Sequence, residues 1–270
     1  MDNRPIGVFD SGLGGLTAVK ELMRIMPNEN ILYFGDTGRV PYGSRGRDII
    51  VHYAKQDMHF LLENNVKAVL AACGTVSSTA KEEGDSLPIP YMDVLRPTAK
   101  AAVQKTKNRK IGIIGTSATI ASGSYRREIS ALAPDIEVYE QACPLFVPLV
   151  ENAFVSPDDE VTRLVAERYL SGLRDAGVDT LILGCTHYPI ISATIQNVMG
   201  DGVTLVDAGR EAAIGCLDAL REKKLLCSPE QKPTHRFFVS DETQSFHRVA
   251  DLFLGQSIQG RVERIDIEKY

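Results

Sequence analysis

The chain has 270 residues, of which 44% are hydrophobic and 24% are charged, and its formal net charge is −5. This composition is typical of a folded globular protein and excludes disordered, collagen-like and disulfide-rich chains. Lysine and arginine are scattered along the sequence, so we expect neither nucleic acid nor a membrane surface as the main partner. No basic and apolar leader precedes the first predicted strand, and no apolar run approaches the roughly 18 residues of a membrane span, which predicts a cytoplasmic protein.

The predicted elements alternate between strands and helices from the N-terminus onward. A buried strand is expected at IGVF (6–9) and a helix at GLTAVKELMRIM (15–26). The apolar side chains of that helix form one stripe at helical spacing, made of Leu16, Val19, Leu22, Met23 and Met26. Three later runs, AVLAA, IGIIG and TLILG, are apolar on consecutive residues, as expected for strands buried on both faces of a parallel sheet.

Two more helices are indicated by the residues at their ends. The stretch 156–177 offers Ser156 or Asp158 as an N-cap, then an apolar periodicity, and Gly177 after the last turn. Near the C-terminus, RFFVSDETQSFHRVADLFLG (236–255) predicts a strand, an acid-rich helix start and a helix. Strands that alternate with helices indicate an α/β architecture.

The chain also contains an internal repeat. VKAVLAACGT (66–75) aligns with VDTLILGCTH (178–187), and IGVFDSG (6–12) aligns with IGIIGTS (111–117) in the same order. We therefore predict two similar lobes with mainly parallel sheets, related by a pseudo-twofold, with the active site in the cleft between them.

The domain boundaries follow from the repeat. The first lobe is expected to comprise residues 1–96 plus 207–270, and the second lobe residues 97–206. The segment after residue 207 is assigned to the first lobe because the second copy of the repeat is already complete at that point.

The five cysteines form no C-x-x-C pair, and they are Cys73, Cys143, Cys185, Cys216 and Cys227. An odd number without such a pair argues against a disulfide framework and against a zinc site, so we expect no metal. A free cysteine is most often a small buried hydrophobic residue, which is the interpretation for Cys143, Cys216 and Cys227. Cys73 and Cys185 differ because they lie at equivalent positions of the repeat.

Polar groups follow the predicted strands at their carboxyl ends, where parallel sheets bind ligands. They are Asp10 and Ser11, Cys73 and Thr75, Thr116 and Thr119, and Cys185, Thr186 and His187. Each has an ordinary alternative: Asp10 and the threonines are typical helix caps, and a lone histidine is usually structural. The stretch DSGLGG is also compatible with a simple turn, because its glycine spacing fails the dinucleotide-binding pattern.

A pair of thiols facing one cleft suits the inversion of a carbon stereocentre. Such a reaction needs a base on one face of the carbon and an acid on the other, with the roles exchanged in the reverse direction. A free cysteine has a pKa of about 8.5, so neighbouring groups must activate it. Asp10 is expected to help Cys73, and His187 to help Cys185. Hydroxyl groups and amides in the loops at the helix starts would hold the carboxylates of an anionic substrate.

Six motifs in order resemble those of the cofactor-independent glutamate racemases, over residues of about 5 to 210. They are GVFDSGLGGLTAVKEL, PYG, the first cysteine motif, GTSAT, CPLFVPLVE and GCTHYP. The resemblance implies glutamate as the small-molecule substrate, with no metal, flavin or pyridoxal phosphate. It also implies a bacterial protein that supplies D-glutamate for peptidoglycan, and relatives of this kind are often homodimers.

The resemblance assigns roles to individual residues. Cys73 would abstract the proton from D-glutamate and Cys185 from L-glutamate. Asp10 would assist Cys73, while Glu151 and His187 would assist Cys185. Positions that match substrate contacts are Ser11, Pro41, Tyr42, Gly43, Gly74, Thr75, Thr116, Thr119 and Thr186.

One departure from the family concerns the residue after the first cysteine, which is usually asparagine and here is Gly74. A lost side-chain hydrogen bond costs about 1 to 3 kcal/mol, which predicts weakened or altered substrate binding. On this reasoning Gly74→Asn would raise kcat/KM for glutamate.

Three other functions compete with glutamate racemisation. Gly74 would suit a racemase for aspartate or a related amino acid, or a carboxylate-binding protein that has lost catalysis. A cysteine hydrolase with His187 as the base for Cys185 is the third. It is disfavoured because neighbours at a strand end tend to point in different directions and because Cys73 would have no role.

Overall fold

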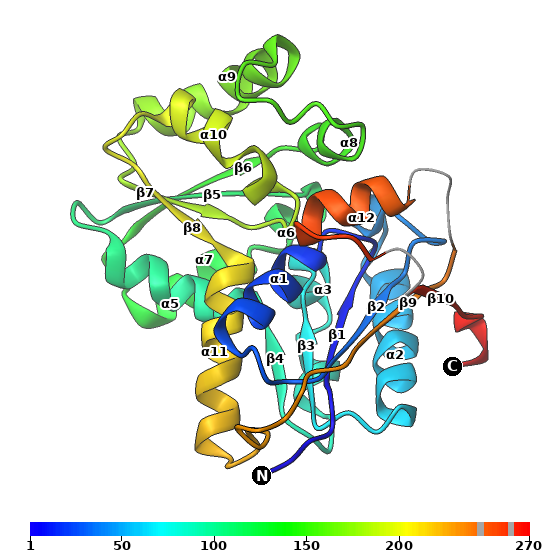
Figure 1. Ribbon diagram of the computed structural model, residues 1–270. Coiled ribbons are helices and arrows are strands. Elements are labelled where there is room, and N and C mark those ends of the chain that lie inside the picture. The colour runs from blue at the N-terminus through cyan, green and yellow to red at the C-terminus, as the bar shows by residue number, and fades with distance from the viewer. Residues whose placement is uncertain (242–245, 259–261) are drawn as a thin grey trace.

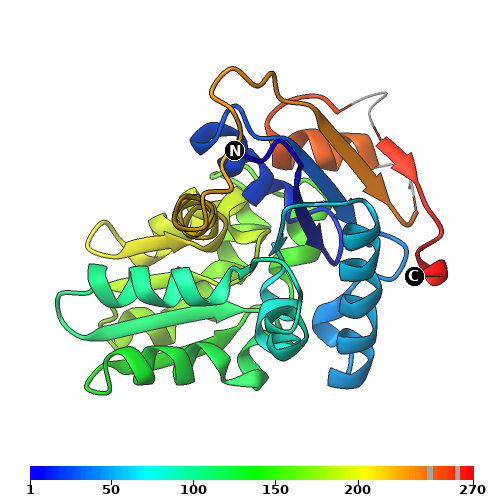
Figure 2. The same ribbon diagram turned by 90° about the horizontal axis from the view of Figure 1, so that it is seen from below.

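The computed structural model describes residues 1–241, 246–258 and 262–270, and it shows two α/β lobes (Figure 1). The expected fold class is confirmed, since each lobe is built on a fully parallel sheet. Both chain ends lie in the first lobe (Figure 1). Seen from below, the second lobe, in green and yellow, lies beside the first lobe, in blue, cyan and orange (Figure 2).

The first lobe has a six-stranded sheet in the order β10-β9-β2-β1-β3-β4. Its strands are β1 (Ile6–Asp10), β2 (Ile31–Gly35), β3 (Ala68–Ala71), β4 (Tyr91–Asp93), β9 (His235–Val239) and β10 (Val262–Arg264). Its helices are α1 (Leu16–Ile25), η1 (Tyr42–Ser44), α2 (Arg47–Glu63), α3 (Gly74–Thr79), α4 (Lys81–Asp85), α11 (Ala208–Glu222), α12 (Phe246–Leu254) and η3 (Ile267–Lys269).

The second lobe has a four-stranded sheet in the order β6-β5-β7-β8. Its strands are β5 (Lys110–Gly115), β6 (Glu137–Ala142), β7 (Thr180–Leu183) and β8 (Thr204–Asp207). Its helices are α5 (Leu95–Lys105), α6 (Ser117–Ser122), α7 (Ser124–Leu132), α8 (Phe146–Glu151), α9 (Glu160–Asp175), η2 (Tyr188–Ile191) and α10 (Ser192–Met199).

The internal repeat is visible in the strand order and in the register. The block β2-β1-β3-β4 of the first sheet has the same order as β6-β5-β7-β8 of the second. Ile6 of β1 lies opposite Ala68 of β3, and Ile111 of β5 lies opposite Thr180 of β7. These are the partners that the sequence alignment of the two copies requires, so the repeat is confirmed and the two cysteines occupy equivalent strand ends.

The apolar runs form the cores of both lobes. Strands β1, β2, β3 and β7 are buried at every residue, because helices cover both faces of their sheets. One cluster of buried side chains continues from the first lobe into the second. Helix α11 packs against α1 of the first lobe and α5 of the second, and this packing fixes the two sheets beside the cleft.

Helix ends differ in detail from the sequence-based expectation. The N-cap of α9 is Asp159, whose carboxylate accepts a hydrogen bond of 2.8 Å from the amide of Thr162, so the choice of Ser156 or Asp158 was wrong. The expected helix end is confirmed, because Gly177 has a left-handed φ of 73°. Most of the acid-rich start expected before α12 lies at 242–245, outside the described residues. No helix in the described part of the chain is long and apolar enough to cross a membrane.

Candidate active site

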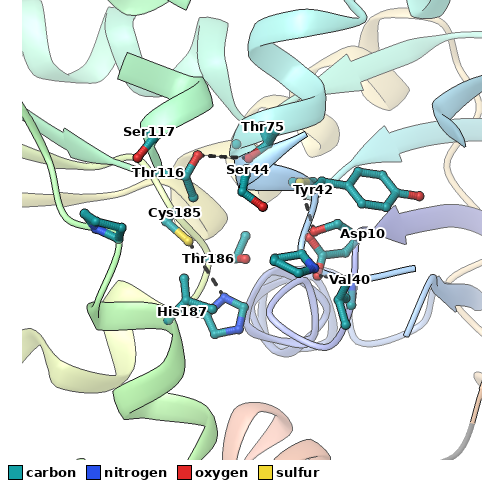
Figure 3. A pocket seen from close by; sticks show the side chains of 18 of the residues that line it. Asp10, Val40, Tyr42, Ser44, Thr75, Thr116, Ser117, Cys185, Thr186 and His187 are labelled. Atoms are coloured by element: carbon teal, nitrogen blue, oxygen red, sulfur yellow. Dashed lines mark hydrogen bonds between the residues drawn. The ribbon is translucent and has the colours of Figure 1, made fainter. Parts of the chain in front are cut away.

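A cavity of about 330 Å³ lies between the carboxyl ends of the two sheets (Figure 3). Both lobes contribute to its wall. From the first lobe, the residues are Asp10, Ser11, Gly12, Val40, Pro41, Tyr42, Gly43, Ser44, Cys73, Gly74 and Thr75. From the second lobe, they are Thr116, Ser117, Pro144, Val147, Pro148, Glu151, Gly184, Cys185, Thr186 and His187. The structure therefore brings together all of the residues singled out in the sequence except Thr119.

The first thiol, Cys73, follows strand β3 and is only 4% exposed. Its sulfur lies 3.4 Å from the hydroxyl oxygen of Ser11. Burial raises the pKa of the Cys73 thiol to about 12, and the negative charge of Asp10 adds to this effect. At neutral pH Cys73 is therefore a protonated thiol, the form that can act as an acid.

Asp10 ends strand β1 and is completely enclosed by protein. Its carboxylate accepts hydrogen bonds from the amides of Gly12 at 3.2 Å and Gly15 at 3.0 Å, so it caps the turn that leads into α1. Burial raises the pKa of Asp10, while the charge of His187 and the two amides act in the opposite direction. The structure thus shows the ordinary capping role of Asp10, and the same carboxylate interacts with Cys73.

The second thiol, Cys185, is part of a relay. Its sulfur lies 3.8 Å from Nδ1 of His187 (Figure 3). Nε2 of His187 lies 3.1 Å from Oε1 of Glu151. Burial lowers the pKa of His187, but hydrogen bonds to Cys185 and Glu151 outweigh it and raise the pKa to about 10. His187 is therefore an imidazolium at neutral pH, and it stabilises negative charge on the neighbouring sulfur.

This contact corrects one argument made from the sequence. Cys185 and His187 were expected to point in different directions because they lie at a strand end. Residues two apart share one face of a strand, so alternation gave no ground for that expectation. Strand β7 moreover ends at Leu183, and residues 185–187 belong to a turn that leads into η2. The objection that remains to a hydrolase is Cys73, which lines the same cavity and would have no role.

An aromatic ring that the sequence did not indicate packs against the relay. Phe253 of helix α12 meets the His187 ring at a centroid distance of 5.0 Å and an interplanar angle of 80°. Phe253 is completely buried. It holds the imidazole from the first lobe, and only the tertiary fold brings residues so distant in sequence together.

A chain of threonine hydroxyls crosses between the lobes beside the cavity. The hydroxyl oxygens of Thr75 and Thr116 lie 3.0 Å apart (Figure 3). Those of Thr116 and Thr119 also lie 3.0 Å apart. Thr116 additionally caps helix α6 by accepting a hydrogen bond of 3.2 Å from the amide of Thr119. Thr119 is not part of the cavity wall, and its place in the structure is behind Thr116, which it orients.

The loop that contains Pro41, Tyr42 and Gly43 forms one wall of the cavity. The hydroxyl of Tyr42 donates to Asp36 and lies 3.2 Å from Asp57. In Figure 3 this hydroxyl points away from Cys185. Tyr42 therefore anchors the loop by its side chain, and the loop forms part of the cavity wall.

Gly74 has no room for a side chain. A Cβ atom added there would lie 2.1 Å from the carbonyl oxygen of Gly184, which is far inside contact distance. The space that an asparagine would need is occupied by the backbone of the second lobe. This contact argues against the expectation that Gly74→Asn raises kcat/KM, which stays a prediction for kinetics to test.

Several cavity residues were missed in the sequence. Val40, Ser44 and Ser117 adjoin residues that were named, while Pro144, Val147 and Pro148 belong to the CPLFVPLVE motif. Membership of that motif was a usable signal for the three apolar residues. In the described part of the chain, no lysine or arginine lines the cavity, and no group of three metal-ligating side chains was found.

The fold and the cavity define a class of protein, the two-lobed racemases with one thiol on each wall of the cleft. A family model described as Asp/Glu/Hydantoin racemase matches residues 36–214. The chain belongs to this racemase family.

Named relatives cover the whole chain. The glutamate racemase of Syntrophus aciditrophicus is 44% identical over 97% of this chain and 97% of its own length. That of Thermoanaerobacter pseudethanolicus is 43% identical over 100% of both chains. The crystal structure of glutamate racemase from Francisella tularensis, in complex with D-glutamate, has a TM-score of 0.93 at 42% identity and covers 100% of both chains.

Proposed function

We propose that this protein interconverts L-glutamate and D-glutamate without a cofactor, by proton transfer between the substrate and two thiols. The observation that carries the proposal is that Cys73 and Cys185, at equivalent strand ends of the two lobes, line one cavity. The glutamate racemases to which the chain is similar over its full length support the choice of reaction.

The charges around the thiols suggest how the reaction begins. Cys185 beside the His187 imidazolium is the base that removes the α proton of L-glutamate, so the C–H bond breaks and an S–H bond forms. Cys73, protonated at neutral pH, donates its proton to the opposite face of the α carbon. The product is D-glutamate, and proton exchange with solvent returns both sulfurs to their starting forms. In the reverse direction the two thiols exchange roles.

Asp10, Glu151 and His187 are proposed to assist the thiols through their charges. Asp10 attracts the proton that Cys73 gains or loses, and Glu151 keeps His187 protonated and oriented. The positive charge of His187 lies beside the Cys185 sulfur. Each helper therefore acts first on the thiol beside it, and the charges of Asp10 and His187 also interact with each other.

The substrate carboxylates are bound by neutral donors. The described cavity wall contains no lysine or arginine, so hydroxyls and backbone amides must satisfy the two carboxylates. The hydroxyl donors available are those of Ser11, Ser44, Thr75, Thr116, Ser117 and Thr186. Glutamate is the substrate proposed because the Francisella tularensis structure at 42% identity contains D-glutamate.

The biological setting is part of the proposal. D-Glutamate supplied by this enzyme would enter peptidoglycan in a bacterium. A cytoplasmic location suits the mechanism, because cellular reductants keep both thiols reduced there. The division into residues 1–96 plus 207–270 and residues 97–206 suits the sheets, although Asp207 is at once the last residue of β8 and the N-cap of α11.

The test is isotope exchange in deuterated water with single enantiomers of glutamate and of aspartate. We expect optical rotation of glutamate to fall to zero while deuterium enters the α carbon. Turnover of aspartate alone would assign the protein to a different racemase of the same family. Binding of glutamate by calorimetry without exchange or racemisation would show a carboxylate-binding protein and overturn the proposal.

A further inference from the structure

Three glycines of the described first lobe meet residues of the second lobe that line the cavity. A Cβ added to Gly14 would lie 2.3 Å from Oγ1 of Thr186, and one added to Gly43 would lie 2.9 Å from Cβ of Thr116. A Cβ added to Gly74 would lie 2.1 Å from the carbonyl oxygen of Gly184. At these three places the second lobe leaves no room for a side chain on the first lobe.

The contact at Gly74 differs from the other two in what it meets. Gly14 and Gly43 face side chains, which can rotate, whereas Gly74 faces a backbone carbonyl. Gly74 directly follows the thiol of the first lobe, and Gly184 directly precedes the thiol of the second. Any displacement at this contact therefore changes the separation of the two catalytic sulfurs.

Gly184 cannot retreat from the contact within its own lobe. Its amide donates a hydrogen bond of 2.8 Å to the carbonyl of Ile114 on the neighbouring strand β5. On the same side, a Cβ on Gly184 would lie 2.7 Å from that carbonyl oxygen and 3.2 Å from the ring of Tyr125. A clash at Gly74 would therefore be relieved by a shift of residue 74 with the adjoining Cys73, by separation of the lobes, or by distortion of the chain that carries Cys185.

We propose that Gly74 is a positioning residue whose missing side chain sets the width of the cleft, so that Cys73 and Cys185 reach the same α carbon from opposite faces. This inference rests on the proposed racemisation. A Cβ contact with an oxygen under 3.0 Å essentially never occurs, so an added methyl at 2.1 Å requires a displacement of about 1 Å. A misplacement of about 1 Å at reacting groups costs about 100-fold in rate.

The experiment compares Gly74→Ala and Gly74→Asn with wild type and with Gly172→Ala. Gly172 lies in helix α9, and a Cβ there would meet nothing within 4 Å, so this control should retain activity. We expect kcat for glutamate to fall about 100-fold in both Gly74 variants. In deuterated water, the substrate should also gain deuterium more often with retained configuration at the α carbon than with inverted configuration, compared with the wild type. The reason is that the opposite thiol is too distant to complete the transfer.

The ratio of retained to inverted product distinguishes a positioning role of Gly74 from a role in stability alone. Lower stability would reduce all turnover equally and leave this ratio unchanged. A folded Gly74→Ala variant with wild-type kcat and a wild-type ratio would overturn the inference. If Gly74→Ala does not fold, Gly43→Ala keeps the inference testable. Its milder contact predicts a smaller rise in the ratio of retention to inversion, measured against Gly172→Ala. An unchanged ratio in Gly43→Ala would contradict the inference.

A crystal structure of Gly74→Ala tests the geometry without reference to activity. We expect the Gly184 carbonyl to lie about 1 Å further from residue 74 than in the wild type. An unmoved carbonyl would overturn the inference. Absence of racemisation by the wild type would instead refute the proposed function, and the two failures are thereby distinguished.

Discussion

The two thiols occupy equivalent strand ends but have different electrostatic surroundings. Cys73 lies near a buried carboxylate, Asp10, and its pKa is raised to about 12. Cys185 contacts His187, whose pKa of about 10 makes it a cation at neutral pH. The repeated backbone therefore places the sulfurs at equivalent positions, while the side chains beside them differ in charge.

Thermodynamics limits how the different surroundings of the two thiols can appear in the kinetics. Two enantiomers have equal free energies in water, so kcat/KM must be equal in the two directions whatever the charges at the thiols. Asymmetry between the thiols can appear only in kcat and KM separately, or in isotope exchange. Each of the following predictions changes one side of the comparison and measures these quantities.

The largest effect is expected from removing either sulfur. Cys73→Ser and Cys185→Ser should each reduce racemisation by about 1,000-fold or more, because a serine hydroxyl is a far weaker acid than a thiol. Exchange with deuterated solvent should survive in Cys73→Ser only for L-glutamate and in Cys185→Ser only for D-glutamate. Exchange of both enantiomers in one of these variants would contradict the two-thiol assignment. Cys216→Ser, which changes a buried thiol outside the cavity, is the control.

Removing the imidazolium should have the next largest effect. His187→Gln should lower kcat/KM about 100-fold in both directions. KM for L-glutamate should rise more than KM for D-glutamate, because the lost positive charge lies beside Cys185, the thiol proposed to act on L-glutamate. Equal changes in the two KM values would show that His187 does not act on Cys185.

The matching change on the other side is Asp10→Asn. It removes the charge but keeps an oxygen that can accept from the amides of Gly12 and Gly15. We expect kcat to fall about tenfold to a hundredfold, less than for the thiol itself. KM for D-glutamate should rise more than KM for L-glutamate, which is the opposite of the change expected in His187→Gln. Steady-state kinetics from both enantiomers will show which KM rises more.

Glu151→Gln should be milder. The Glu151 side chain is 41% exposed, so solvent weakens its interaction with His187. We expect about a fivefold loss of kcat/KM, corresponding to about 1 kcal/mol. A loss as large as that of His187→Gln would mean that Glu151 does more than orient the ring.

Stability should depend on pH through His187. Its pKa is raised from 6.5 in the unfolded chain to about 10 in the folded protein, so the protonated ring stabilises the fold. This contribution is complete below about pH 6.5 and is lost as the pH rises through about 10. The free energy of unfolding in urea, measured for wild type and His187→Gln at about pH 6.5 and about pH 10, should fall more in the wild type. Equal falls in the two proteins would contradict a raised pKa at His187.

The fold was largely predictable because its signals are local. Continuous apolar runs marked the buried parallel strands, and the two aligned cysteine motifs gave the correct pairing of Ile6 with Ala68 and of Ile111 with Thr180. The cap of α9 was misplaced because Ser156, Asp158 and Asp159 are chemically equivalent candidates within one turn. Only the backbone path decides which of them reaches the amide of Thr162.

The site was predictable where strand ends supplied its residues and was missed where distant segments met. Phe253 lies far from His187 in sequence, and its contact with the ring had no signal in the pattern. The side chain of Tyr42 points away from the cavity because buried carboxylates capture its hydroxyl. Gly74 was interpreted as a lost hydrogen bond, because the sequence cannot reveal that the carbonyl of Gly184 fills the space.

The shared strand order of the two sheets also bears on how such a protein changes over time. A half-length unit with a single thiol could place two thiols around one substrate only by pairing with a copy of itself. Joining two such units in one chain lets each half mutate alone, without imposing the change on the other. Three features occur in one half only: strands β9 and β10, the contact of His187 with Glu151, and Gly74. They are changes that one half carries without the other.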